Sequence, residues 1–375
     1  MIINNLQLKH FRNYDNLDIY FNDKVNIFIG NNGQGKTNII ESIYMLAITK
    51  SHRTFTDNNV IKNGFKVSKI RGIIKKNIED SNSEVELLLN NKGKKLTINK
   101  KQIKKISDYI SYLNVVIFHP DDLEILKGSP HERRKFLNIE IGQLDNIYIF
   151  ILNNYNNVLK QRNEYLKSIN IDNYDKDYLE ILTNQLIDNA IKIYKYRSNF
   201  IDNINKKLDF VNKRIKGLES IEIKYESYIP LDNFEELREI LKNKYDLNLK
   251  REIIMAQTMI GPHRDDFVFL VNGKNAKSFS SQGQQRIAVL MLKLGEIEMF
   301  YERYKEYPIL LLDDIFSELD IEKKENIVKY INRKMQIIIT TTDINDVDKS
   351  LIRKASVFMV DNALVYKTDN FKSEV

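Results

Sequence analysis

The stretch Gly30-Asn31-Asn32-Gly33-Gln34-Gly35-Lys36-Thr37 decides the fold of this chain, because it matches the phosphate-binding pattern G-x-x-x-x-G-K-[ST] in full. It follows directly on the apolar run Val25–Ile29 and precedes a segment in which Ile40, Ile43 and Ala47 recur at helical spacing. Strand, glycine-rich loop and helix therefore come in the order that a phosphate-binding loop (P-loop) requires. This context favours a nucleotide site over an ordinary glycine-rich turn.

The residue types of the loop indicate what each position would do for a nucleotide. Glycines let backbone N–H groups curl around phosphate oxygens, and the N-terminus of the following helix adds its dipole. Lys36 would neutralise the β and γ phosphates, and the Thr37 hydroxyl would ligate Mg²⁺. ATP and Mg²⁺ are therefore the predicted cofactors. The predicted ATP-binding residues of the loop are Gly30, Asn31, Asn32, Gly33, Gln34, Gly35, Lys36 and Thr37.

A second element that suits nucleotide chemistry is the run Ile309–Asp313, which continues into Asp314. It places two carboxylates at the end of an apolar strand. The first can hold Mg²⁺, and the second can orient the attacking water. Acids at a strand end often form only a polar turn, but the P-loop upstream favours the functional reading. We predict Asp313 as a magnesium ligand, and Asp314 together with Lys36 as catalytic residues.

A third candidate is Ser281-Gln282-Gly283-Gln284, which precedes a segment with apolar residues at helical spacing. A serine hydroxyl, a glycine N–H and a helix N-terminus can bind an anion. A capped helix without any ligand fits the same residues equally well. The order along the chain favours the functional reading, because the P-loop comes first, this segment second, and the acidic strand with Ser317-Glu318-Leu319-Asp320 last. Ser281, Gly283 and Gln284 are predicted to contact ATP.

The rest of the chain predicts an α/β protein with a helical insertion. Turn residues and short strand-like runs from about 60 to 116 indicate a β-meander, in which we also place the run 114–118. Helical periodicity from about 144 to 166 and from 179 to 204, with a polar turn at 168–175, predicts a short antiparallel hairpin in a packed helical lobe. Apolar runs at 308–312 and 336–339 are typical of buried parallel strands, so we expect one sheet that is split in sequence.

These patterns divide the chain into three segments. Residues 1–120 would form the N-terminal half of an ATPase head, residues 121–250 the helical lobe, and residues 251–375 the C-terminal half of the head. Lysine and arginine total 58 against 51 acids, a net charge of +7 that would suit a polyanion such as DNA. The bias toward Asn, Ile, Lys and Tyr also fits AT-rich codon usage, so charge alone is weak evidence for DNA.

Several classes are excluded or disfavoured. The chain has no cysteine, which excludes disulfides, thiolate metal sites and cysteine nucleophiles. The start of the chain alternates apolar and polar residues, and no stretch approaches the ~20 apolar residues that cross a bilayer, so we expect a soluble, cytoplasmic protein. Its five histidines are scattered, which disfavours a zinc site. We expect His263 to have a structural role.

The motifs and their order resemble the ATP-binding-cassette superfamily, and several longer strings are similar to the RecF family within it. This resemblance covers nearly the whole chain. It implies an ABC-type (SMC-like) P-loop ATPase head with an inserted helical lobe that contains the short antiparallel hairpin. The strings similar to the RecF family lie at 9–14, 50–54, 120–123, 127–130 with 133–134, 159–163 and 261–266.

The resemblance also implies a function. RecF-like proteins suggest a weak, DNA-stimulated ATPase of DNA replication and recombinational repair, whose ATP-dependent homodimer clamps single-stranded, gapped or linear duplex DNA without sequence specificity. It would assist RecO and RecR, and indirectly RecA, and support the SOS response at the nucleoid, with no membrane partner. Ser281 and Gly283 would contact the nucleotide of the other protomer, and residues 317–320 would cross the dimer interface. Arg12 matches an arginine that reaches the nucleotide in related heads.

Three positions depart from related heads. His119 follows the strand near Phe118, where relatives have a glutamine that contacts magnesium and water, so that role is unassigned. Thr340 and its neighbours stand where transporter heads carry a histidine, and threonine cannot titrate as imidazole does. Asp314 is shorter than the glutamate of many relatives. Together these departures predict slow hydrolysis.

Two other functions fit part of the pattern. A soluble ATPase subunit of an ABC transporter would share the P-loop, the signature segment and the acidic strand, but the helical hairpin argues against it. A structural clamp that binds ATP without hydrolysing it would also carry the P-loop. Loss of the second carboxylate would leave DNA release by such a clamp unchanged, which separates it from an ATPase.

Overall fold

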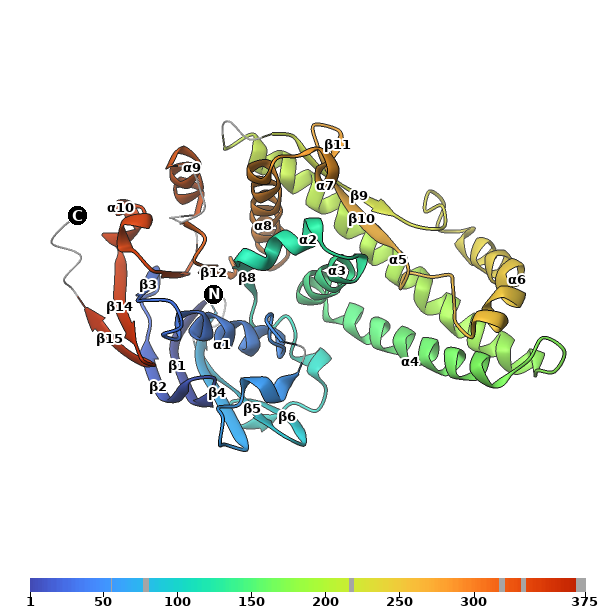
Figure 1. Cartoon of the computed structure of the whole chain (residues 1–375), viewed down its shortest axis with the longest axis horizontal. Coiled ribbons are helices and arrows are strands. Elements are labelled where there is room, and N and C mark those ends of the chain that lie inside the picture. Colours follow the sequence, from blue (N-terminus) through green and yellow to red (C-terminus); the bar gives the residue numbers. More distant parts are fainter. Residues whose placement is uncertain (55, 77–80, 216–218, 317–320, 332–334, 369–375) are drawn as a thin grey trace. The chain divides into compact units, whose positions relative to one another are not determined.

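The computed structural model describes residues 1–54, 56–76, 81–215, 219–316, 321–331 and 335–368 (Figure 1). Contacts divide the chain into two compact units. The first comprises Met1–Asp122, Phe210–Leu218 and Leu290–Val375, and the second comprises Leu123–Asp209 and Glu219–Val289. Residues 251–289, which we expected in the C-terminal half of the head, group with the helical segment instead.

An antiparallel sheet of the first unit contains the two N-terminal strands and the predicted meander, in the order β2-β1-β4-β5-β6-β7. Its strands alternate, as in β5, where every second side chain from Ser83 to Leu89 is buried. This period of two makes one face apolar and leaves the other polar. The strands are β1 (Ile2–Phe11), β2 (Tyr14–Tyr20), β4 (Val67–Lys75), β5 (Asn82–Asn90), β6 (Gly93–Ile98) and β7 (Lys101–Gln102).

A second sheet of the first unit runs in the order β15-β14-β3-β13-β12-β8 and is parallel from β14 to β8. Strands β3, β8, β12 and β13 are buried along their whole length, as their unbroken apolar runs predict. The strands are β3 (Val25–Ile29), β8 (Val115–Phe118), β12 (Ile309–Asp313), β13 (Ile337–Thr341), β14 (Ala355–Asp361) and β15 (Leu364–Thr368).

This sheet confirms that the parallel core is assembled from both ends of the chain, but one detail of the prediction was wrong. The run placed in the meander forms β8, which pairs in parallel with β12 because all four of its residues are apolar and buried. The predicted sheet that is split in sequence is therefore present, and the meander forms a separate antiparallel sheet.

Short helices and turns connect these strands within the first unit. Helix α1 directly follows the P-loop and is buried along most of its length. The helices are α1 (Lys36–Ile48), η1 (Asp57–Val60), η2 (Ile106–Asp108), η3 (Pro120–Asp122), α9 (Ile321–Ile331), η5 (Ile344–Asp346) and α10 (Lys349–Ile352).

The second unit contains the predicted helical hairpin (Figure 1). Helix α4 (Asn146–Ser168) and helix α5 (Lys176–Asn212) run antiparallel, since Tyr196 contacts Asp145 near one end and Arg162 contacts Thr183 near the other. The polar turn lies between the two helices, as predicted. The remaining helices are α2 (Leu123–Lys127), α3 (Pro130–Leu144), α6 (Leu237–Met255), α7 (Ala276–Phe279) and α8 (Gln282–Tyr304), of which α8 extends into the first unit.

A small antiparallel sheet of the second unit was not predicted. Its order is β11-β10-β9, with strands β9 (Ile221–Glu226), β10 (Asp266–Val271) and β11 (Lys274–Asn275). None of the described helices is both long and apolar enough to cross a membrane.

Candidate nucleotide-binding site

The P-loop lies between β3 and α1, and its glycines are required by space and by backbone conformation. Gly33 has φ +81° and Gly35 has φ +118°, values that residues with a side chain rarely adopt. A Cβ at Gly35 would also lie 2.7 Å from the Tyr14 hydroxyl. At Gly30 a Cβ would meet the Val360 carbonyl oxygen at 2.2 Å. The glycine pattern thus reflects the close approach of the β14 backbone at Gly30 and of the Asn13 and Tyr14 side chains at Gly35.

The carbonyl groups of the loop are held by neighbouring residues, while its N–H groups are not. Asn13 Nδ2 donates to the Gln34 carbonyl at 3.1 Å, and the Tyr14 hydroxyl donates to the Gly35 carbonyl at 3.1 Å. Among the described residues, none accepts a hydrogen bond from the backbone N–H groups of 31–36. Successive N–H groups at a helix N-terminus form an anion-binding concavity. The loop is therefore built to receive phosphate oxygens.

Lys36 begins α1 and folds back over the loop. Its Nζ donates to the Gly30 carbonyl at 2.6 Å and to the Asn31 carbonyl at 2.9 Å. Burial lowers the pKa of Lys36, while Asp314 and Asp313 act in the opposite direction. These two hydrogen bonds are ones that phosphate oxygens of a nucleotide can replace.

The acidic strand end lies beside the P-loop, as predicted. Thr37 Oγ1 donates to Asp313 Oδ1 at 2.9 Å, and Thr340 Oγ1 donates to the same oxygen at 2.6 Å. Asp314 follows with φ +53°, and its N–H donates to the Thr340 carbonyl at 3.1 Å. The two predicted magnesium ligands thus touch each other, although 276 residues separate them in sequence.

This donor set fits Mg²⁺ bound together with a nucleotide. A hydroxyl and a carboxylate are the hard oxygen ligands that Mg²⁺ prefers, and the ion usually takes its remaining ligands from phosphates and water. Within the described part of the chain, no three side chains of His, Cys, Asp or Glu form a group that could hold a metal alone. Thr37 and Asp313 therefore fit a nucleotide-bound Mg²⁺, and their role as its ligands remains a prediction.

Sequence reasoning missed the role of Thr340, which was considered only as a replacement for histidine. Its hydroxyl fixes Asp313 from the neighbouring strand, because β12 and β13 are paired in parallel with Asp313 opposite Thr340. No local motif marks such a threonine. The signal that could have found it is that residues at the carboxyl ends of neighbouring parallel strands meet at one edge.

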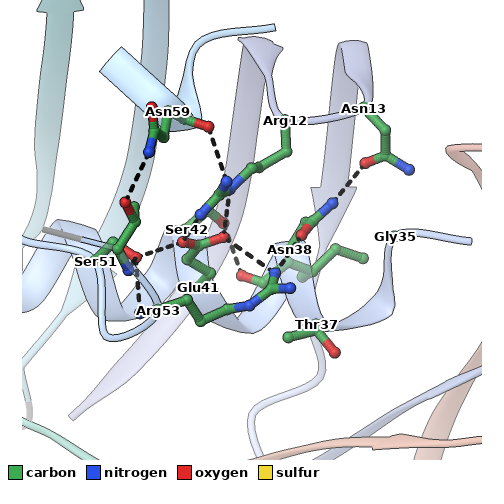
Figure 2. Close-up of polar contacts among 12 residues, drawn as sticks. Arg12, Asn13, Gly35, Thr37, Asn38, Glu41, Ser42, Ser51, Arg53 and Asn59 are labelled. Atoms are coloured by element: carbon green, nitrogen blue, oxygen red, sulfur yellow. Dashed lines mark hydrogen bonds and ion pairs between the residues drawn. The ribbon is translucent and has the colours of Figure 1, made fainter. Parts of the chain in front are cut away.

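Arg12, predicted to reach the nucleotide, is held by α1. Its Nε and Nη2 form a bidentate pair with Glu41 at 2.8 and 2.5 Å, and its Nη1 donates to the Asn59 carbonyl at 2.8 Å (Figure 2). Glu41 is 0% exposed. Buried carboxylates require such pairing. The contact of Arg12 with a nucleotide remains a prediction, since its guanidinium is engaged here by Glu41.

Glu41 also binds the segment after α1. Ser51 Oγ donates to Glu41 Oε1 at 2.5 Å, and Arg53 Nη1 lies 3.6 Å from Glu41 Oε2 (Figure 2). Arg53 donates in addition to Asn38 Oδ1 at 2.9 Å. Sequence reasoning missed this cluster, although a glutamate in the apolar part of α1 could have indicated it.

The signature segment lies in the second unit, where it caps α8. Ser281 Oγ accepts from the Gln284 N–H at 3.2 Å, and Gln284 Oε1 accepts from the Ser281 N–H at 2.6 Å. This reciprocal pair is a capping box. Ser281 and Gly283 are exposed, so the helix N-terminus can be approached by another molecule. The capped-helix reading is confirmed, and the nucleotide contact remains a prediction.

Two other predictions concern residues 317–320 and His119. Residues 317–320, predicted to cross a dimer interface, lie outside the described residues. His119 leaves β8 at the same edge of the sheet as Asp313, and its Nε2 lies 3.2 Å from Asp122 Oδ1. It therefore stands at the carboxyl edge of the parallel sheet, and the role of the glutamine remains unassigned.

The comparisons with known proteins agree with this architecture. Residues 2–365 match the family model described as the RecF/RecN/SMC N-terminal domain. A DNA replication and repair protein RecF of Ligilactobacillus salivarius is 40% identical, with 100% of both chains covered. The RecF of Bacillus cytotoxicus is 41% identical over 97% of this chain and 98% of its own.

Solved structures are similar too. A structure of the recombination mediator protein RecF with ATP, in the RecFOR pathway, superposes with a TM-score of 0.90 at 33% identity, covering 98% of this chain and 97% of that one. An Smc head domain from Pyrococcus furiosus, bound to the C-terminal domain of ScpA, has a TM-score of 0.55 at 15% identity, covering 99% and 97%. The second likeness concerns the fold alone.

Proposed function

Because this chain belongs to the RecF family of DNA replication and repair proteins, we propose that it is an ATPase whose ATP-bound dimer holds DNA. The observation that carries this proposal is the contact between Thr37 and Asp313 beside a loop whose N–H groups are unengaged by other described residues. This arrangement suits a triphosphate with Mg²⁺.

In the proposed mechanism, each residue of the site has one task. The N–H groups of 31–36 and the Lys36 ammonium bind the β and γ phosphates, after Lys36 leaves the loop carbonyls. Thr37 and Asp313 hold Mg²⁺, which supplies charge neutralisation at the phosphates when it is bound. Asp314 orients the attacking water. Thr340 keeps the Asp313 carboxylate in position.

The proposed dimer places the signature segment of one protomer on the nucleotide of its partner. Ser281 and Gly283 are exposed in the single chain, which leaves the α8 N-terminus available to a partner's γ phosphate. A Cβ at Gly283 would meet only the Ser281 hydroxyl, at 4.0 Å, so this surface is open. ATP would thus be the link between the protomers.

We propose that the DNA is single-stranded, gapped or linear duplex DNA, recognised by its phosphates without sequence specificity. The net charge of +7 supports such contacts. Slow, DNA-stimulated hydrolysis would then release the clamp. By analogy with the RecFOR pathway named for the relative, RecO and RecR are the proposed partners, with RecA reached indirectly, at the nucleoid and in the SOS response.

Sedimentation of wild type, Lys36→Met and Ser281→Arg with ATP and Mg²⁺, with and without a gapped duplex, tests this proposal. Wild type is expected to dimerise with ATP, and both variants are expected to stay monomeric. The two variants separate the steps, because Ser281→Arg should still bind ATP whereas Lys36→Met should not. A wild type that remains monomeric with ATP and DNA would refute the clamp and favour a transporter-type or plain nucleotide-binding role.

A further inference from the structure

A hollow in the second unit carries an unbalanced positive charge. It has a volume of about 500 Å³, and Arg134, Arg264 and His131 are among the residues that line it. Its lining also includes Ser129 and Tyr228, and it contains no aspartate or glutamate among the described residues. All of these residues belong to the second unit. The hollow is therefore separate in sequence from the P-loop and the acidic strand.

The nearest carboxylates are engaged with other groups. Arg133 forms a bidentate pair with Asp266, with distances of 2.6 and 2.8 Å. Asp265 is buried, and its Oδ2 accepts from the Tyr225 hydroxyl at 3.0 Å. Arg133 and Asp266 thus form an ion pair, and Asp266 and Asp265 both lie close enough to Arg134 to act on its pKa.

Among the described residues, the two arginines of the hollow donate hydrogen bonds only to backbone carbonyls. Arg134 Nη1 donates to the Asp265 carbonyl at 2.8 Å, and Arg264 Nη2 lies at 3.4 Å from the Thr258 carbonyl. The Arg264 Nε is buried and has no hydrogen-bond partner among the described residues. Burial lowers the pKa of Arg134 and the charges of Arg197 and Arg264 lower it further, while Asp266 and Asp265 act in the opposite direction. Neither guanidinium group forms an ion pair with a described carboxylate, and both are partly exposed, so each can bind an added anion.

Helix α3 adds to this potential. It begins at Pro130 with Ser129 as its N-cap, and the Ser129 side chain makes no capping hydrogen bond. The N-terminus of a 15-residue helix contributes a partial positive charge and unpaired N–H groups. The hydroxyl of Ser129 is thus available as a further donor toward the hollow.

We propose that this hollow binds a phosphate group of a DNA strand, held by Arg134 and Arg264 and by the N-terminus of α3. Guanidinium groups bind phosphate oxygens through several hydrogen bonds at once. Tyr228, 66% exposed, offers an aromatic face on which the attached nucleoside can stack. The inference rests on the proposed function and extends it, since it names a site where DNA is held.

DNA binding by charge-matched variants tests the proposal. Arg134→Gln and Arg264→Gln are compared with Arg251→Gln, which removes the same charge from an exposed position of α6 outside the hollow. Affinity for a labelled gapped duplex is measured by fluorescence anisotropy over a range of salt concentrations. Each hollow variant is expected to bind about tenfold more weakly and to lower the salt slope by about one, whereas the control keeps the slope of wild type.

Two versions of the duplex identify the kind of phosphate. One carries a 5′-phosphate at the gap and the other a 5′-hydroxyl. If wild type prefers the phosphorylated end and both variants lose the preference, the hollow binds a terminal phosphate. Equal losses on both duplexes indicate a phosphodiester of the backbone. Either result supports the proposal.

The proposal is overturned if both variants bind like Arg251→Gln. A wild type that fails to bind any DNA refutes the proposed function itself, so the two failures are distinguishable. If a variant does not fold, phenylglyoxal modification of the intact wild type gives the answer. Gapped duplex should protect Arg134 and Arg264 but not Arg251, and unprotected hollow arginines would also overturn the proposal.

Discussion

Two groups of buried charges in this chain are arranged in opposite ways, one around the P-loop and one in the second unit between α4, α5 and α6. Lys36 of the P-loop donates to loop carbonyls that a ligand can replace. In the second unit Arg197 binds the Tyr148 and Tyr225 hydroxyls and the Pro262 carbonyl. Those partners come from three separate segments and hold them together.

The difference teaches how to separate binding residues from structural ones when both are buried. In a binding site, a buried charge has hydrogen-bond partners that a ligand can replace, and donors without partners lie beside it. A structural charge has partners in the fold that it loses only when the protein unfolds. Changes around the P-loop should therefore affect turnover and nucleotide affinity. Changes in the second unit's network should affect the free energy of unfolding. The following predictions test this separation.

The largest effect is expected for Arg162→Met in the second unit. Arg162 is 1% exposed and Glu252 is 0% exposed, and they form an ion pair of 2.7 Å. Removing the arginine leaves a buried carboxylate without its cation, which costs ~3–5 kcal/mol of unfolding free energy. Urea denaturation measures this loss, and ATP affinity of the folded fraction should not change.

The matched control is the double variant Arg162→Met/Glu252→Met. Replacing a whole buried pair by apolar side chains of similar size is often neutral, so most of the lost stability should return. A double variant as unstable as the single one would show that hydrogen bonds such as Arg162 to Thr258, at 2.8 Å, matter more than the charge pair.

The next effect concerns turnover. Asp314→Asn should lower the rate of ATP hydrolysis by about a hundredfold, as expected for loss of a general base. ATP-induced dimerisation should persist, because Lys36 and Thr37 are unchanged. Single-turnover hydrolysis and sedimentation measure the two properties separately. Unchanged hydrolysis would exclude Asp314 as the catalytic base.

A pH effect is expected in the second unit. Burial lowers the pKa of His263 to about 4, and the ring contacts the Tyr155 hydroxyl at 2.6 Å and the Thr258 carbonyl at 3.2 Å. The unfolded histidine titrates near pH ~6.5, so the unfolded chain binds more protons between these values. Stability should therefore fall as pH drops through this window, by about 2 kcal/mol between pH 7 and pH 5.

The variant His263→Gln isolates this effect. It cannot titrate, so its loss of stability between pH 7 and pH 5 should be smaller than that of wild type. Equal slopes in thermal unfolding at both pH values would show that other groups dominate the acid sensitivity.

The sequence predicted the parts of the site that lie on one continuous motif. The P-loop follows from its own spacing, and the two carboxylates at 313 and 314 follow from an apolar run that ends in acids. The helical hairpin was predicted from the helical spacing of apolar residues, and its turn was predicted from the polar residues at 168–175. Local patterns of this kind are visible without knowledge of distant contacts.

The remaining features depend on contacts between distant residues. The pairing of Glu41 with Arg12 joins α1 to the end of β1, and no spacing rule connects residues 29 positions apart. The β9 and β10 pairing joins residues on either side of α6. Strand 115–118 was assigned to the wrong sheet because a short apolar run does not reveal its neighbour. These features are set by tertiary contacts, which local sequence patterns do not show.

The smallest effect is expected for a substitution of Thr340. If Thr340 belongs to the binding site, its loss should affect ligand affinity and not the free energy of unfolding. Thr340→Val keeps the shape but removes the hydrogen bond of 2.6 Å to Asp313. A hydrogen bond to a charged group contributes roughly 1.5 kcal/mol, so affinity for Mg²⁺-ATP should fall about tenfold.

The variant Thr341→Val is the control, because the Thr341 hydroxyl donates to the Asp343 carbonyl instead. Calorimetric titration at several Mg²⁺ concentrations should show a magnesium-dependent loss for Thr340→Val alone. An equal loss in both variants would mean that the end of β13, and not the Asp313 carboxylate, controls binding.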